Sequence, residues 1–87
     1  MGRSALYDQT KRLIVRKHSV NILGHQTSIT LEDEFWTALK DAAQKRSISL
    51  NKLIAEIDEQ RGSKNLSSAI RVYILKSLQQ SLTAADL

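Results

Sequence analysis

The sequence of 87 residues contains no cysteine and no proline, and it has only three glycines. Without cysteine no disulfide can staple the chain, and two histidines alone do not make a structural zinc site. No apolar run approaches the roughly 20 residues that span a bilayer, and the N-terminus lacks the apolar stretch of a signal peptide. These absences predict one small cytoplasmic domain without metal or cofactor.

What is present indicates a folded domain that is not an enzyme. Hydrophobic residues make up 41% of the chain and charged residues 25%, which is typical of a globular protein. So short a chain has little room to wall off a pocket, and neither His18 nor His25 has a catalytic partner placed by a motif. Because a chain of this size buries little apolar surface, oligomerisation is expected to complete its core.

The positive charge is concentrated at the N-terminus. Residues 1–25 hold five basic residues and one acidic residue, whereas residues 26–87 hold eight of each sign. We therefore interpret residues 1–17 as a flexible basic arm, attached to a single domain over residues 18–80. A basic arm is a common footprint of nucleic-acid binding, and the alternative is a solvated tail that keeps the protein soluble.

A β-hairpin is predicted over about residues 18–31. Residues 27–31 alternate polar and apolar side chains, and Gly24-His25 suits a type II′ turn. That turn places Leu23 opposite Gln26 and Val20 opposite Ile29. One face of the hairpin then collects the apolar residues Val20, Ile22, Ile29 and Leu31. The other face collects the neutral polar residues Ser19, Asn21, Gln26, Ser28 and Thr30.

Three helices are predicted after the hairpin, over about residues 32–46, 49–61 and 65–80, with a frayed tail at 81–87. Acidic residues open the first helix, Ser49 and Asn65 are suitable N-caps for the others, and Gly62 suits the C′ position of the second. The third helix has a wide apolar face, which suggests burial on more than one side. Trp36 and Tyr73 lie on apolar stripes and are expected in the core rather than stacked on a ligand.

Two segments carry a resemblance to a known family. Ser-Ile-Thr-Leu-Glu-Asp-Glu-Phe-Trp at residues 28–36 and Arg-Ser-Ile-Ser-Leu-Asn-Lys-Leu-Ile at residues 46–54 resemble the ribbon-helix-helix family, which includes the Arc and methionine repressors. The likeness covers roughly residues 25–61. The longer context resembles a subgroup with a preceding strand at residues 20–23 and a trailing segment at residues 65–71. The fold that this implies is mainly α with a short β ribbon, assembled as a dimer.

The resemblance implies a role for particular residues. In the family, strands from two chains pair antiparallel and enter the DNA major groove, where the positions matching Gln26, Ser28 and Thr30 read base edges. The start of the second helix would hold a phosphate, and basic residues of the arm would add charge. The implied phosphate-binding residues are Ser49, Leu50, Asn51, Lys52, Arg16 and Lys17. The implied dimer core is Ile29, Leu31, Trp36, Leu39, Leu53, Ile54 and Ile57.

The preceding strand is a departure from the family pattern. If both chains fold the hairpin, a dimer presents four strands, which span roughly 14 Å between outer axes. The major groove is about 12 Å wide. Either the first strand leaves as an arm, or the outer strands rest on the groove walls, or the DNA is bound in another way.

Two functions are compatible with these features. The first is a homodimeric repressor that binds double-stranded DNA at an inverted repeat and regulates transcription. The alternative is a protein-interaction module, or an antitoxin, that uses the same dimer fold and offers its third helix to a protein partner. Burial of that helix within the dimer would weaken the alternative.

Overall fold

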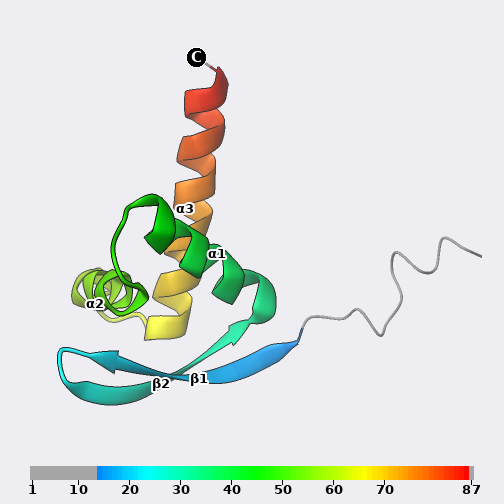
Figure 1. Cartoon of the computed structure of the whole chain (residues 1–87). Helices are drawn as coiled ribbons and strands as arrows, with labels where there is room; N and C mark the ends of the chain where they lie inside the picture. Colours follow the sequence, from blue (N-terminus) through cyan, green and yellow to red (C-terminus); the bar gives the residue numbers. More distant parts are fainter. Residues whose placement is uncertain (1–13, 87) are drawn as a thin grey trace, which may run out of the picture.

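A computed structural model describes residues 14–86 of the chain, with a two-stranded antiparallel sheet followed by three helices. Figure 1 shows the hairpin as a separate layer, with all three helices above it. The predicted fold class, mainly helical with a short β ribbon, is confirmed. The elements are β1 (Val15–Ile22), β2 (His25–Glu32), α1 (Asp33–Lys45), α2 (Leu50–Gln60) and α3 (Leu66–Asp86).

The hairpin turn consists of Leu23 and Gly24, so the predicted turn at Gly24-His25 is wrong by one residue. Both turn residues have positive φ, 52° for Leu23 and 88° for Gly24. Positive φ at both central positions is typical of a type I′ turn, whose twist matches that of the flanking strands. The side chain of Asn21 supports the turn, because its Oδ1 accepts a hydrogen bond of 2.9 Å from the Gly24 N–H.

The pairing of the strands is consequently shifted by two residues from the predicted register. Val20 lies opposite Thr27 rather than Ile29, and Asn21 lies opposite Gln26 rather than Ser28. Side chains alternate with a period of two, so a shift by two leaves each residue on its predicted face. The four apolar residues predicted for the inner face, Val20, Ile22, Ile29 and Leu31, are all buried.

The helix boundaries follow the caps that the sequence predicts. Ser49 Oγ accepts a hydrogen bond of 3.0 Å from the Lys52 N–H at the start of α2, and Asn65 Oδ1 accepts one of 2.8 Å from the Ser68 N–H at the start of α3. Gly62 has φ of 62°, as expected for the residue after the end of a helix. At the end of α1, Ser47 adopts φ of 58°, a conformation more often taken by glycine.

Two element bounds differ from the prediction. β1 begins at Val15, so residues 15–17 of the predicted arm belong to the hairpin. Within the arm, residues 1–13 lie outside the described residues. α3 continues to Asp86, through the residues predicted as a tail, and the fraying of that tail stays a prediction. None of the helices in residues 14–86 has the combined length and apolar character needed to cross a membrane.

One apolar core joins the hairpin to all three helices. Besides the four inner-face residues of the hairpin, it contains Leu39, Ala43, Leu53, Ile54, Ile57, Ala69, Ile70 and Ile74. Each fully buried Leu or Ile side chain contributes about 1.5–3 kcal/mol relative to an exposed one. Trp36 and Tyr73 pack partly buried against this core, and the Trp36 ring stacks on His18 with 3.7 Å between ring centroids.

The wide apolar face of α3 is buried on one side only. Ala69, Ile70 and Ile74 belong to the core, but a second set of apolar residues on the same helix is exposed. This set, which we call the α3 stripe, consists of Val72, Leu75, Leu78 and Leu82. The sequence predicted that α3 is buried on more than one side. Within a single chain, only one side of the helix is buried.

Candidate nucleic-acid interface

The face of the hairpin that points away from the helices is polar and exposed. Gln26, Ser28 and Thr30 alternate along β2 with buried Ile29 and Leu31, so their side chains point outward. The residues directly opposite them in β1 are Asn21, Ser19 and Lys17, which are exposed as well. We call these six residues the outer face: Lys17, Ser19, Asn21, Gln26, Ser28 and Thr30.

The chemistry of the outer face is that of a hydrogen-bonding surface with one positive charge. Its amide side chains each offer donors and an acceptor, its hydroxyls offer both, and Lys17 offers three donors. The acidic residue that adjoins it, Glu32, is partly buried and bonded to Arg71. Such a surface can meet the base edges of a DNA groove without repelling the phosphates.

The outer edge of β2 is held by the first turns of α3. The Thr30 N–H donates to Ser67 Oγ at 3.2 Å, and Arg71 Nη2 donates to the Thr30 carbonyl oxygen at 3.4 Å. Arg71 Nε also donates to Glu32 Oε1 at 2.9 Å, and the Arg71 guanidinium lies 5.9 Å from the centre of the Phe35 ring. Arg71 thus ties the end of β2 to both α1 and α3.

The same contact changes the acidity of Glu32. The hydrogen bond from Arg71 holds the pKa of the Glu32 carboxyl below its ordinary value, and a hydrogen bond from its own main chain acts in the same direction. Glu32 therefore remains negatively charged at a lower pH than a free carboxyl would. That charge faces Arg71 where β2 meets α1 and α3.

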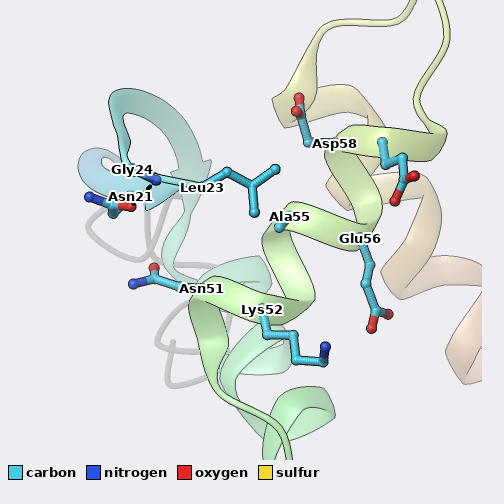
Figure 2. Close-up of a pocket in the computed structure, with 9 residues that line it drawn as sticks. Asn21, Leu23, Gly24, Asn51, Lys52, Ala55, Glu56 and Asp58 are labelled. Carbon is cyan, nitrogen blue, oxygen red and sulfur yellow. Dashed lines mark hydrogen bonds between the residues drawn. The ribbon is translucent and has the colours of Figure 1, made fainter.

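The N-terminus of α2 lies beside the tip of the hairpin. Figure 2 shows Asn51 of α2 directed toward the hairpin tip and the side chain of Leu23 directed toward Ala55, while the Lys52 side chain points away from the tip. Residues of the hairpin tip and of α2 together line an open groove of about 610 Å³. Leu23 is 85% exposed, so it covers little of that groove.

The predicted phosphate-binding residues at this helix start retain free groups. Ser49 Oγ caps the Lys52 N–H, whereas the first two N–H groups of a helix, here those of Leu50 and Asn51, have no partner within the helix. The Lys52 side chain is exposed. These are the groups that bind an anion at a helix N-terminus.

Arg16 and Lys17, both predicted to bind phosphate, lie on opposite faces of β1. Arg16 Nε donates to Asp33 Oδ1 at 3.0 Å, so its guanidinium is paired with the first residue of α1. Lys17 lies on the outer face opposite Thr30. Of the two residues, only Lys17 shares the surface of Gln26, Ser28 and Thr30.

The predicted dimer core is buried within one chain. Its six aliphatic members are each at most 5% exposed without a partner chain, and Trp36 is half-buried against His18. The aliphatic members are Ile29, Leu31, Leu39, Leu53, Ile54 and Ile57. Their burial does not require a second chain, and the share of a partner in this core stays a prediction.

A comparison with protein families identifies the architecture. The family model described as "Ribbon-helix-helix domain" matches residues 15–78, which is more than half of the chain. The chain belongs to the ribbon-helix-helix family. The suspected resemblance is confirmed, and it extends beyond residues 25–61 to include β1 and most of α3. No curated protein and no solved structure matched the chain.

Ribbon-helix-helix domains are DNA-binding regulators of transcription rather than enzymes, and this general role applies to the chain. Sequence reasoning did not name Ser19 and Asn21 as site residues, although it placed both on the polar face. It also missed Ser67 and Arg71, which hold β2. The outer-face residues carried a signal in their alternation, whereas no local pattern relates Arg71 to Glu32, 39 positions away.

Proposed function

We propose that this ribbon-helix-helix domain is a homodimeric, sequence-specific DNA-binding repressor that inserts its hairpin into the major groove. The observation that carries the proposal is the outer face, on which the side chains of Gln26, Ser28 and Thr30 are exposed and do not pack in the core. Gln can bond bidentately to adenine, and Ser or Thr can bond to base edges within reach. Occupancy of a promoter by the domain would then block transcription.

Phosphate contacts would position the hairpin. We assign them to the N-terminus of α2, through the N–H groups of Leu50 and Asn51 and the side chain of Lys52, with Ser49 as the cap that orders this turn. Lys17 adds a positive charge beside the base-reading residues. Arg16 contributes less in this arrangement, because Asp33 neutralises it. Contacts of this kind fix the orientation on DNA without reading its sequence.

The second chain of the dimer is proposed to dock on the α3 stripe. Leu75, Leu78 and Leu82 are 54%, 57% and 69% exposed, and their spacing of three and four residues is that of a helix-pairing seam. A second copy presents the same stripe, so the contact is self-complementary about a two-fold axis. Each chain would then carry its own hairpin to one half of an inverted repeat.

The decisive test of DNA reading is selection from random duplex DNA at two salt concentrations. An enriched inverted repeat at both concentrations is the expected result. Binding without enrichment that disappears at the higher salt concentration would leave only electrostatic attraction by the basic arm.

The dimer is tested by sedimentation of the full chain against two charge variants of α3. Leu78→Lys places a charge in the α3 stripe, while Gln80→Lys adds the same charge about 200° further round the helix. We expect the Leu78→Lys protein to sediment as a monomer and the Gln80→Lys protein as a dimer. A wild-type chain that is monomeric at all concentrations would overturn the homodimer.

A second candidate function rests on the same stripe. In a protein-interaction module or an antitoxin, α3 would bind another protein rather than a second copy. A monomeric wild-type chain that still enriches DNA sequences would favour this alternative, because the exposed apolar residues would then lack an occupant. A dimer sensitive to Leu78→Lys favours the homodimeric regulator.

A further inference from the structure

The start of α3 holds the main chain of Thr30 through both of its polar groups. The Thr30 N–H donates to Ser67 Oγ at 3.2 Å, and Arg71 Nη2 donates to the Thr30 carbonyl oxygen at 3.4 Å. Both bonds lie on the edge of β2 that faces away from β1. The Thr30 side chain stays exposed on the outer face. The two contacts therefore fix the main chain of a proposed base-reading residue and leave free the side chain that would meet DNA.

Ser67 and Arg71 lie one turn apart on the same face of α3. A spacing of four residues places two side chains above each other on a helix, so both reach the same edge of β2. The first turn of α3 is ordered by Asn65, whose Oδ1 caps the helix. Ile70, between the two residues in sequence, is 0% exposed and anchors the helix in the core. α3 is therefore a fixed support for this end of β2.

Arg71 holds the strand at two points rather than one. Its Nε donates to Glu32 Oε1 at 2.9 Å, two residues beyond Thr30, and its guanidinium lies 5.9 Å from the centre of the Phe35 ring. The side chains of Arg71 and Glu32 are only 33% and 18% exposed. Because the donors of a guanidinium are fixed in one plane, bonds to both acceptors set the direction of the strand from Thr30 to Glu32.

The other proposed base-reading residues of β2 lack this support. By alternation, the main-chain groups of Gln26 and Ser28 point to the same edge as those of Thr30. Within residues 14–86, these groups make no hydrogen bond to any helix. That stretch of the edge stays open to a strand from a second chain. Support from α3 is thus confined to the Thr30 end of β2.

The position of the main chain matters most for a short side chain. The Thr30 hydroxyl is joined to the main chain by one rotatable bond, so it moves whenever the strand moves. A hydrogen bond between a hydroxyl and a base edge needs a separation of about 2.5–3.0 Å between its heavy atoms. A displacement of about 1 Å is enough to lose such a bond. A residue that holds the Thr30 main chain therefore influences how Thr30 reads DNA.

We infer that Ser67 and Arg71 of α3 are positioning residues for DNA recognition, which hold the end of β2 so that Thr30 keeps a fixed place against its base pair. The inference rests on the proposed DNA-reading function and deepens it, because it gives the third helix a part in sequence preference. Neither residue touches DNA in this role. Their loss should therefore alter the preference at the base pair of Thr30 and leave unchanged the preference at the base pair of Gln26.

Selection from random duplex DNA tests the two residues in the full chain. Ser67→Ala removes the acceptor of the Thr30 N–H, and Arg71→Gln removes the guanidinium that contacts Thr30 and Glu32. Both variants should relax the preference at the base pair that Thr30→Ala relaxes, by about twofold to tenfold, the worth of one hydrogen bond. Ser67→Thr keeps the hydroxyl and should keep the wild-type preference. Ser67→Ala leaves Arg71 paired with Glu32, so it tests the inference even if the Arg71→Gln protein does not fold.

Ile70→Val is the matched control for a loss of stability without a loss of position. It removes one buried methylene group from α3 and leaves Ser67 and Arg71 in place. Hydrogen exchange of the Thr30 amide, compared with the neighbouring Ile29 amide that bonds to β1, measures the hold of α3 on the strand directly. Ser67→Ala should speed exchange at Thr30 relative to Ile29 by up to about tenfold. Ile70→Val should leave that ratio unchanged.

The outcomes separate this inference from the proposed function. If the wild-type chain enriches no sequence, both are overturned. If Thr30→Ala relaxes the preference while Ser67→Ala and Arg71→Gln select the wild-type sequences, the positioning role is overturned and the proposed function stands. The same holds if Thr30→Ala changes nothing while Gln26→Ala relaxes the preference. It also holds if Ile70→Val relaxes the same base pair as Ser67→Ala, because lost stability would then explain the effect.

Discussion

The two faces of the hairpin are made from alternate residues of the same two strands, yet one face is buried against the helices and the other is exposed. On the inner face, Ile29 and Leu31 are 2% and 0% exposed and contact the helices. On the outer face, Ser28 and Thr30, their neighbours in sequence, are exposed and have side chains with no role in the core. Substitutions one residue apart can therefore change the buried face or the exposed face separately.

We expect the largest effect on stability from a substitution on the inner face. Ile29→Ala removes buried methyl groups and leaves a cavity, which should lower the free energy of unfolding by roughly 2–5 kcal/mol. Equilibrium unfolding followed by circular dichroism measures the change. Ser28→Ala is the matched control and should leave the unfolding midpoint nearly unchanged, and equal losses in the two variants would contradict the assignment of the faces.

The next largest effect is expected from substitutions on the outer face, which should change the DNA sequence preference and leave the fold intact. Gln26→Ala removes up to two hydrogen bonds to one base pair, so we expect a loss of about 1–3 kcal/mol in discrimination at that pair. Ser28→Ala and Thr30→Ala should act in the same way but more weakly, because a hydroxyl makes fewer bonds. Competition binding measures the preference, with Gln44→Ala on the exposed side of α1 as the control. Full sequence preference in all three hairpin variants would show that β2 does not read DNA.

A third effect separates attraction to DNA from reading of its sequence. Removing residues 1–13 deletes three basic residues and one acidic residue and leaves β1 intact, since the strand begins at Val15. If these residues contact phosphates, affinity should fall similarly for all sequences, and the slope of log affinity against log salt should flatten by about 0.9 per lost contact. An unchanged slope would show that residues 1–13 do not contact phosphates and serve solubility instead.

The smallest expected effect concerns the end of β2, where the two faces meet α3. The folded pKa of Glu32 lies below its ordinary value of 4.5 because of Arg71. Stability from this pair is therefore fully present above about pH 4.5 and is lost as the pH falls through the lower, folded-state pKa.

Unfolding midpoints measured across that pH range should fall more for the wild type than for Glu32→Gln. Asp41→Asn on the exposed side of α1 is the matched control and should retain the wild-type dependence. An identical pH dependence in the wild type and Glu32→Gln would show that the Arg71 contact adds nothing to stability.

Most of the local structure was predictable because its causes are local. Alternation in residues 27–31 identified β2, Ser49 and Asn65 identified two helix starts, and Gly62 identified a helix end. The turn was the exception, since Gly24 fits either the first or the second position of a two-residue turn. In the structure Gly24 takes the second position, with Leu23 at positive φ before it and with Asn21 Oδ1 accepting a hydrogen bond from the Gly24 N–H.

The order of residues was enough to tell which residues of the hairpin are inner and which are outer, because a period of two survives a register shift of two. Only the packed structure shows that a single chain buries Leu53, Ile54 and Ile57, and that β1 extends back to Val15, which puts Arg16 and Lys17 on different faces. It alone also placed Ser67 and Arg71 on the edge of β2. The reason is that these contacts join residues far apart in the chain, and their geometry depends on how the helices pack rather than on any nearby pattern.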